Sequence, residues 1–428
     1  MELKDYIINI VLGSLFGDEG KGNSVQWLCK KALEEGKNPL VIRFSGGAQA
    51  GHRVVNGTDE HICSLIGAGV LLGVPTYLNE NVYIDPVSLK REYEILVNKG
   101  FKPKLYINER CRVVTPYDKI ADFGDQNVQK HGTTGCGIHA TFVRYNSGKQ
   151  WNNSIYRGDC AIMEPEDFLD DVKKYYEKKF HKKITIEKKL VKEFIEAGNW
   201  FNNTFSRSMD ADIMDADIIF VKDMPISSKA FYKPINRETL EEEDIVVPKF
   251  DTLIFEGSQG LLLDMDNGFM PHCTPSRVGL NGIDEKYLNG ANVYLVMRSY
   301  LTRHGNGFNP KDEDIVRKNY KNLFEASNFD HGPQGKFKIG LLEHRLIRDA
   351  FVRHKLDNYY RMNKCLFNLI ITHMDCVNND QLLIKSGKQI LFENPGDISY
   401  DFGGLGFVPE NIYLGYGPNS DIRYYEGK

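Results

Sequence analysis

The sequence predicts an α/β protein in which an open, mostly parallel sheet is flanked by helices. Short apolar runs, beginning with 6–12, are followed by glycine-rich loops, and an amphipathic helical pattern over 24–33 follows the first loop. Further strands are predicted at 41–44, 252–255, 292–297 and 366–371. Polar residues come directly after several of these runs, which is where open α/β sheets bind their ligands.

The first glycine-rich loop has the sequence GDEGKG and covers 17–22. A strand, a glycine loop and a helix in succession direct backbone N–H groups and a helix N-terminus at a phosphate. A Walker A loop would need glycine at position 15 and serine or threonine at position 22, where the chain has Leu15 and Gly22. The loop is therefore not a standard P-loop. Asp18 beside Lys21 suggests chemistry next to a nucleotide, and a tight turn with surface charges is the plainer alternative.

A second glycine-rich loop, GGAQAGH at 46–52, follows the next predicted strand. Gly47 and Gly51 let the backbone come close to a ligand or metal. His52 is the one residue of this loop that can transfer a proton near neutral pH. Two such loops after two early strands, one with Asp and Lys and one with His, favour a catalytic site over a histidine that only hydrogen-bonds its surroundings.

The composition restricts the class of partner. The 428 residues include 54 basic and 58 acidic side chains, so the formal net charge of −4 gives no support for a nucleic-acid partner. The 8 cysteines form no C-x-x-C pair, which indicates reduced thiols in a cytoplasmic protein. We also see no signal-peptide pattern and no apolar run of transmembrane length, so we expect no membrane association.

The chain shows no internal repeat and no low-complexity linker, so we expect a single domain over 1–428. Within it, Lys, Glu and aromatic residues at helical spacing over about 165–206 predict a helical subregion with a solvated, charged face. The segment 223–248 contains three prolines and is predicted to be an irregular linker or hairpin.

Seven segments, taken together and in this order, resemble the adenylosuccinate synthetase family. They are GDEGKG at 17–22, GGAQAGH at 46–52, GTTGCG at 132–137, FEGSQG at 255–260, TRHGNG at 302–307, THMD at 372–375 and GYGP at 415–418. The resemblance spans residue 6 to about 420. It implies that family's P-loop-related fold, with a large, mostly parallel central sheet, and a homodimer.

The resemblance also implies a C–N bond-forming ligase of purine biosynthesis. In the family, the counterpart of Asp18 removes the N1 proton of IMP, and O6 attacks the γ-phosphate of GTP beside the counterpart of His52, an acid. L-aspartate then displaces the 6-phosphoryl group to give adenylosuccinate, GDP and phosphate. Lys21, the loop amides and Mg²⁺ would stabilise charge on the phosphoryl group. ATP or dATP is the alternative donor.

The residues that the resemblance assigns fall into sets. The catalytic set is Asp18, Lys21, His52 and Gln259. The GTP set is Gly17, Glu19, Gly20, Lys21, Gly22, Asn23, Gly51, His52, Arg53, Thr372, His373, Asp375, Gly415 and Gly417. The monophosphate set is Asp18, Gln49, Ala50, Thr133, Thr134, Arg144, Gln259 and Thr274. Mg²⁺ would lie on the Asp18 carboxylate and the Gly51 carbonyl, since a hard cation prefers oxygen.

Some of these positions depart from the family pattern. Gln49 stands where Asn is usual, Cys136 replaces an arginine, and Arg144 is the nearest candidate for the arginine that a partner subunit places on the monophosphate. Asp375 matches the acid that binds the guanine edge, which favours GTP over ATP. His373 stands where the family has lysine.

The amino-acid loop departs most. Where the family has Thr-Thr-Gly and a run of arginines, 331–343 is HGPQGKFKIGLLE. The expected contacts to the amino acid are therefore His304, Gln334, Gly335, Lys336 and Lys338. An arginine fork clamps a carboxylate with two bonds, whereas lysine acts as a point charge. The loop could instead accept a different amine or sugar.

Two further hypotheses follow from these departures. A phage-borne branch of the family, acting in the host cytoplasm, makes 2-amino-N6-succinyl-deoxyadenylate from dGMP. That branch commonly changes the base position, whereas Asp18 is kept here. The other hypothesis is a degenerate, nucleotide-binding regulatory protein, against which the retention of Asp18, Lys21, His52 and Gln259 argues.

Overall fold

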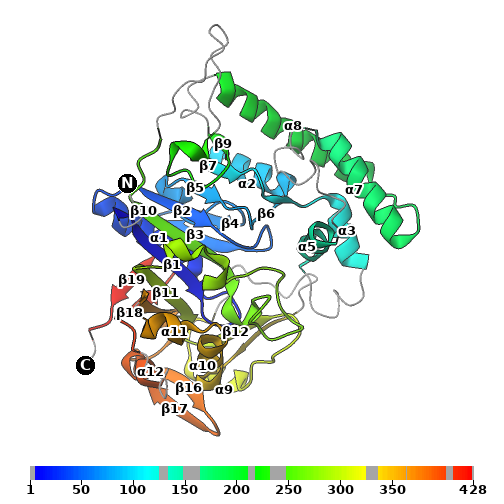
Figure 1. The fold of residues 1–428 in the computed structure, drawn as a ribbon. Coiled ribbons are helices and arrows are strands. Elements are labelled where there is room, and N and C mark those ends of the chain that lie inside the picture. The colour runs from blue at the N-terminus through cyan, green and yellow to red at the C-terminus, as the bar shows by residue number, and fades with distance from the viewer. Residues whose placement is uncertain are drawn as a thin grey trace.

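The computed structural model describes residues 5–124, 134–147, 164–210, 217–231, 247–323, 336–362, 364–401 and 408–426. Its largest element is a 10-stranded sheet in the order β19-β18-β15-β11-β1-β10-β2-β5-β7-β9 (Figure 1). The strands are β1 Ile7–Gly13, β2 Pro39–Arg43, β5 Thr76–Leu78, β7 Leu105–Asn108, β9 Ile218–Val221, β10 Thr252–Gly260, β11 Ala291–Arg298, β15 Cys365–Thr372, β18 Asn411–Tyr416 and β19 Asp421–Tyr424. Neighbours are parallel except for β18 and β19. The predicted α/β class with a mostly parallel sheet is confirmed.

The sheet is buried on both faces, as its near-continuous apolar strands indicate. Side chains of β1 alternate: Ile8 and Ile10 belong to one core cluster and Val11 to the other. Helices α1 Lys21–Glu34, α2 Pro86–Asn98 and α8 Lys188–Asp210 contribute to the core that holds Val11. Helices α10 His344–Arg353 and α11 Leu356–Arg361 contribute to the opposite core. The sheet is therefore the middle of three layers.

Smaller strand pairs and further helices lie outside this sheet. Antiparallel pairs are β3 His52–Asn56 with β4 Asp59–Cys63, β12 Leu301–His304 with β13 Phe337–Gly340, and β16 Leu382–Ser386 with β17 Gln389–Glu393. Parallel pairs are β6 Tyr83–Ile84 with β8 Arg112–Val113, and β14 Leu342–Glu343 with β16. The remaining helices are α3 Pro116–Gly124, α5 Ile138–Asn146, α7 Pro165–Phe180, α9 Glu313–Asn319 and α12 Pro395–Asp401.

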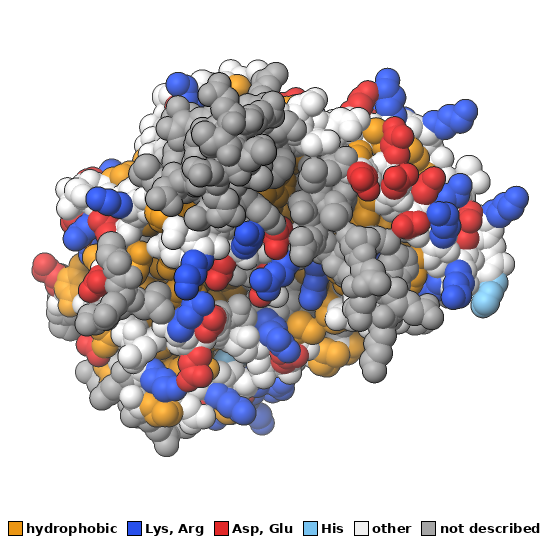
Figure 2. Space-filling view, turned by 45° about the horizontal axis from the view of Figure 1, so that its top comes forward, with side chains coloured by type: hydrophobic (Ala, Val, Ile, Leu, Met, Phe, Trp, Pro, Cys, Tyr) orange, Lys and Arg blue, Asp and Glu red, His pale blue; other side chains and the backbone are white. Residues whose placement is uncertain are grey.

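The predicted helical subregion forms α7 and α8, which lie to one side of the sheet (Figure 1). Phe168 and Phe194 stack between them, and the outer face carries ion pairs such as Lys192 with Glu196. Figure 2 shows Lys and Arg interspersed with Asp and Glu on this part of the face it draws. Much of the predicted linker, residues 232–246, lies outside the described residues.

The cysteines among the described residues are free thiols, as expected. None of the described helices is long and apolar enough to cross a membrane.

Candidate active site

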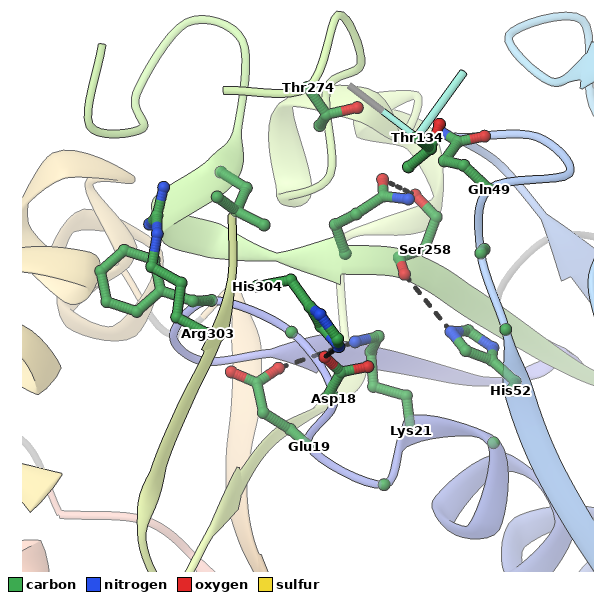
Figure 3. A pocket seen from close by; sticks show the side chains of 18 of the residues that line it. Asp18, Glu19, Lys21, Gln49, His52, Thr134, Ser258, Thr274, Arg303 and His304 are labelled. Carbon is green, nitrogen blue, oxygen red and sulfur yellow. Dashed lines mark hydrogen bonds and ion pairs between the residues drawn. The ribbon is translucent and has the colours of Figure 1, made fainter. Parts of the chain in front are cut away.

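A cavity of about 1210 Å³ lies at the carboxyl ends of β1, β2, β10, β11 and β15 (Figure 3). Most of the described residues that the sequence assigns to a site line it, and the exceptions are Arg144, Lys336 and Lys338. Thr133, Gln334 and Gly335 lie outside the described residues. Parallel strands place their carboxyl ends on one edge of the sheet, and this brings together loops that are hundreds of residues apart.

The first glycine loop is folded back on itself between β1 and α1. Gly17, Asp18 and Gly20 have φ angles of 94°, 57° and 86°, all in the left-handed region. Asp18 adopts this conformation although it is not glycine, which costs energy that the surroundings must supply. The loop conformation therefore depends on contacts from other elements.

Those contacts come from strand ends on the same side of β1. Thr302 Oγ1 donates to the carbonyl of residue 17 at 3.2 Å, and Thr372 Oγ1 donates to the carbonyl of residue 19 at 2.8 Å. Arg298 Nε donates to the carbonyl of Asp18. Three consecutive carbonyls are thus held by side chains of β11, β12 and β15. The sequence analysis did not assign Arg298 or Thr302 to a site, although Thr302 is the first residue of the TRHGNG segment.

The N-terminus of α1 is open toward the cavity. The helix begins at Lys21, its cap residue Gly20 makes no side-chain cap bond, and its first turn contains no acidic residue. Unpaired N–H groups at a helix start attract anions, and a lysine there adds charge. Lys21 is buried, with Nζ 3.6 Å from Glu19 Oε2. This end of α1 is suited to a phosphate.

Glu19 faces inward. Its Oε1 accepts a hydrogen bond of 2.5 Å from the amide of Leu15. Burial raises the pKa of Glu19, and Lys21 opposes that shift. Glu19 therefore stabilises the loop through the amide of Leu15 and forms an ion pair with Lys21.

Asp18 points into the cavity beside His304 (Figure 3). The distance from Asp18 Oδ2 to His304 Nε2 is 3.3 Å. The Asp18 side chain is 29% exposed, so a ligand can reach its carboxylate. A carboxylate beside a histidine is a suitable pair for taking and holding a proton.

His52 is held by two buried side chains that the sequence did not single out. Its Nδ1 lies 2.5 Å from Glu256 Oε1, and Arg43 Nη1 donates to the same oxygen at 3.2 Å. Both ring nitrogens face acceptors, and the Glu256 carboxylate is the nearer and the charged one. The proton of a neutral His52 therefore sits on Nδ1, and Nε2 is the nitrogen that exchanges its proton. Nε2 lies 3.3 Å from the carbonyl of Ser258 (Figure 3).

The electrostatics of this group follow from burial. Burial lowers the pKa of His52, and Glu256 opposes the shift. Arg43 and His52 hold the pKa of Glu256 below its ordinary value against the effect of its own burial. The pKa values of His52 and Glu256 thus depend on each other and on Arg43. Arg43 lies on β2 and Glu256 on β10. The feature of the sequence that could have indicated this group is Glu256, the acid in the FEGSQG segment.

Amide and hydroxyl side chains form the cavity wall opposite the first glycine loop. Gln49, Thr134 and Thr274 lie there (Figure 3). Among the described residues, neither side-chain polar atom of Gln49 has a hydrogen-bond partner although both are buried. A buried amide without partners is costly and indicates a site for a polar ligand. Gln259 Oε1 accepts from Ser258 Oγ at 2.6 Å, which leaves its amide nitrogen for a ligand.

The loops that contain THMD at 372–375 and GYGP at 415–418 meet at the cavity wall. The amide of Gly417 donates to Asp375 Oδ1 at 3.1 Å, and Asn23 Nδ2 donates to the carbonyl of Gly417 at 3.3 Å. The loop after β18 is thereby tied both to the start of α1 and to the loop after β15.

His373 has one consistent tautomer. The Thr372 hydroxyl has a single proton, which it donates to the carbonyl of residue 19, so it accepts at 3.0 Å from Nδ1–H of His373. Burial lowers the pKa of His373 well below its ordinary value, and Arg298 adds to the shift. The imidazole is neutral and keeps Nε2 as an acceptor.

Comparison with known proteins identifies the family. The family model described as adenylosuccinate synthetase matches residues 10–351. The chain belongs to the adenylosuccinate synthetase family.

Curated adenylosuccinate synthetases are distant relatives in sequence. That of Clostridium beijerinckii is 29% identical over 309 residues, covering 70% of this chain and 64% of the relative. That of Mesoplasma florum is 27% identical over 404 residues, covering 91% and 82%. The match to the first of these spans a little less than two thirds of the relative's length.

Two solved structures have the same fold. Fully ligated adenylosuccinate synthetase from Plasmodium falciparum superposes with a TM-score of 0.65 at 18% identity, covering 98% of this chain and all of that one. Cyanophage S-2L succinoaminodeoxyadenylate synthetase, bound to dGMP and to dATP as an energy donor, gives 0.56 at 14% identity, covering 98% and 95%. At these identities the likeness concerns the fold alone.

Arg144, the candidate for the arginine that a partner subunit supplies, makes its contacts within its own chain. Its guanidinium is buried and donates to both carboxylate oxygens of Asp118 at 2.9 Å and to the carbonyl of Val113 at 2.7 Å. Tyr176 donates to the same carboxylate at 2.6 Å. With its fork used by this pair, Arg144 joins α5 to α3 and α7. A contact of Arg144 with the monophosphate of a partner subunit stays a prediction.

The cavity wall near β12 contains an arginine that family resemblance did not assign. Arg303 is buried on β12 with its guanidinium 4.4 Å from the ring centre of Phe16, and burial lowers its pKa to about 10. Among the described residues its Nη1 has no partner. Lys338 is opposite Arg303 on β13, with Nζ donating to the carbonyl of Gly305 at 3.0 Å. Lys336 is exposed.

Proposed function

We propose that this protein is a ligase that joins L-aspartate to carbon 6 of IMP, with GTP as phosphoryl donor, and releases adenylosuccinate, GDP and phosphate. The observation that carries the proposal is the convergence of Asp18, Lys21 and His52 in one cavity, at an open helix N-terminus. A 6-oxo group is a poor leaving group. Phosphorylation makes it a good one, and the amine then displaces phosphate.

Asp18 is the proposed base. Its carboxylate takes the N1 proton, so that negative charge moves to O6 and this oxygen attacks the γ-phosphorus. His304, 3.3 Å away, holds the carboxylate in place. Lys21 and the first amides of α1 stabilise the charge that spreads over the transferred phosphoryl oxygens.

His52 is the proposed acid. It donates from Nε2, because Nδ1 is occupied by Glu256. Burial by itself favours the neutral ring. An anionic phosphoryl group bound beside Nε2 would stabilise the imidazolium and reverse that preference. Binding of the phosphoryl group thus favours the protonated form of His52, which is the form that can donate a proton.

Mg²⁺ fits this site by its donor set. Asp18 offers a partly exposed carboxylate and Gly51 a backbone carbonyl on the cavity wall, and a hard cation prefers both. When bound, Mg²⁺ would neutralise phosphate oxygens.

The remaining contacts follow from the walls of the cavity. We assign the monophosphate nucleotide to Gln49, Thr134, Gln259 and Thr274, and the guanine of GTP to Asp375, whose second oxygen is available for ring N–H groups. Arg303 supplies the positive charge for an aspartate carboxylate, in place of the family's arginine run, with Lys338 beside it. A cytoplasmic homodimer is proposed from the family alone.

Use of dGMP is the second candidate. The absence of the arginine run in 331–343 and the fold shared with the cyanophage enzyme favour it, and the retained Asp18 favours IMP. A degenerate binding protein is the third.

A substrate matrix tests the proposal. IMP, dIMP, GMP and dGMP are each combined with aspartate or another amino acid and with GTP, ATP or dATP, and phosphate release and product mass are measured. We expect adenylosuccinate from IMP, aspartate and GTP, loss of turnover in Asp18→Ala, and normal turnover in Asp171→Asn, a change on the exposed face of α7. Product from dGMP alone would replace IMP as substrate, and no product in any combination would leave the degenerate hypothesis.

A further inference from the structure

A second cluster of potential ligands lies outside the cavity. His61 and Cys63 stand two residues apart on β4, so their side chains lie on the same side of the strand. Glu92, on α2, faces them (Figure 1 shows both elements). All three are buried, and one imidazole nitrogen, the thiol sulfur and one carboxylate oxygen lie within 4.8 Å of one another.

The imidazole is the unsatisfied member of this cluster. Among the described residues, His61 Nε2 is buried and has no hydrogen-bond partner. Glu92 Oε1 lies 3.5 Å away, too far for a good hydrogen bond. A ring nitrogen buried in this way costs about 1–3 kcal/mol. A cation between His61 and Glu92 would satisfy it.

Glu92 is already oriented for such a ligand. Its oxygens accept from the amides of Ser64 at 2.9 Å, Leu65 at 2.9 Å and Ile66 at 3.3 Å. Each carboxylate oxygen has about two acceptor positions. Oε1 accepts from Ser64 and Ile66 and Oε2 from Leu65, so the position that remains for a cation is on Oε2. These three bonds fix the orientation of the carboxylate.

The surroundings contain both signs of charge. Arg43 donates to the carbonyl of Ser64 at 3.1 Å, and its charge is balanced by Glu256. Burial raises the pKa of the Cys63 thiol well above its ordinary value, and Glu92 and Glu256 add to this. A divalent cation reverses that preference, because its charge stabilises the thiolate.

We propose that His61, Cys63 and Glu92 bind one divalent cation of borderline softness, with Zn²⁺ as the best match. Nitrogen, sulfur and carboxylate oxygen are the donors that Zn²⁺ takes in proteins, whereas Mg²⁺ avoids thiolate. On binding, the Cys63 thiol releases its proton to solvent, and thiolate and carboxylate together balance the 2+ charge. The carbonyl of Gly67, 3.8 Å from the sulfur, is the nearest candidate for a fourth ligand.

The site has a structural consequence for the cavity. Cys63 pairs with His52 across the β3–β4 hairpin. A cation held by β4 and α2 therefore fixes the strand that carries the proposed acid. It does so from outside the nucleotide cavity, whose lining includes none of the three ligands.

The test uses the full chain, freed of metal with a chelator and without nucleotide. Zn²⁺ and Co²⁺ are titrated separately. We expect one equivalent of each per chain, a thiolate-to-metal charge-transfer band with Co²⁺, and a rise in melting temperature with Zn²⁺. Excess Mg²⁺ should not compete.

Variants locate the site. Cys63→Ser should abolish the Co²⁺ charge-transfer band, and both it and His61→Gln should weaken Zn²⁺ binding at least tenfold. Cys365→Ser is the matched control, because this buried thiol only donates to the carbonyl of Leu288 at 3.2 Å. Circular dichroism checks that each variant folds. No stoichiometric binding, or equal binding in wild type and in His61→Gln, would overturn the proposal and leave the ligase proposal untouched.

Discussion

At the scale of residues, the proposed chemistry depends on side chains that never contact substrate. His52 is positioned by Glu256, and Glu256 is balanced by Arg43, in a buried row across β3, β10 and β2. A buried charge that loses its partner is strongly destabilising, so the three side chains act as a unit.

That unit predicts non-additive kinetics. His52→Gln should lower turnover by roughly 10²–10⁴-fold, which is the usual contribution of an acid. Glu256→Gln should lower turnover as well, because it removes the charge that opposes the effect of burial on the pKa of His52. The double variant should be no slower than His52→Gln alone. Steady-state rates measured across a pH series check this, and multiplying losses would show that Glu256 acts independently of His52.

Asp122 predicts a pH dependence of stability. It lies on the cavity wall, accepts from the amide of Ala140 at 2.8 Å, and burial raises its pKa from 3.8 to about 7. The folded protein therefore binds this proton more tightly than the unfolded chain. The stability that the group contributes is complete below pH 3.8 and is lost as the pH rises to about 7.

Asp122→Asn removes this dependence and keeps an oxygen acceptor for α5. We expect the fall in unfolding free energy between those pH values to shrink by a few kcal/mol, since one unit of pKa is worth about 1.4 kcal/mol. Urea denaturation of the ligand-free protein at several pH values measures it. Asp171→Asn, on the exposed face of α7, is the control, and an unchanged slope in Asp122→Asn would contradict the assignment.

At the scale of elements, the loops that follow the strands of the central sheet line the cavity. The first glycine loop is strained, and hydrogen bonds from the ends of β11, β12 and β15 hold it. Strand β10 also contacts this loop. Its register with β1 shifts between Val11 and Gly13, and Gly260 lies against the backbone of Leu15 and Gly17. Packing of strand ends thus sets the shape of the phosphate site.

Gly260→Ala tests this contact. A Cβ there would lie 2.5 Å from the amide nitrogen of Gly17 and also meet the carbonyl of Leu15, and neither backbone atom can move aside. We expect a loss of about 1–3 kcal/mol in unfolding free energy and a large loss of turnover. Gly36→Ala, where no atom lies within 4 Å, is the control and should cost about 1–2 kcal/mol of backbone strain without affecting turnover. Full activity in Gly260→Ala would refute the close approach.

At the scale of the whole molecule, the cavity is lined by segments from Phe16 to Pro418. A ligand that contacts all of them should stabilise the fold as a whole. A nucleotide present at 100 times its Kd adds about 2.7 kcal/mol to the unfolding free energy.

This coupling tests the choice of GTP. Thermal unfolding with GTP or ATP, each at the same multiple of its wild-type Kd, should give equal shifts in the wild type. In Asp375→Asn the GTP shift should shrink and the ATP shift should persist, because the proposed contact is a donation from guanine to this carboxylate. Equal losses for both nucleotides would remove the reason for preferring GTP.

Much of this protein could be predicted from local pattern. The α/β class, the predicted strands and the glycine loops follow from apolar runs and chain punctuation, and the family from the order of seven motifs. Helices α7 and α8 followed from periodicity in the same way. These features are local, because hydrophobic period and turn chemistry are carried by neighbouring residues.

Tertiary structure alone decided how distant residues pair. It joined Arg43 to His52 and Glu256, paired Arg144 with Asp118, and placed Arg303 on the cavity wall. It also placed His61 and Cys63 against Glu92. Each of these depends on strand order and register, which no local pattern encodes. The physical reason is that a buried charge takes the partner nearest in space, whatever its distance along the chain.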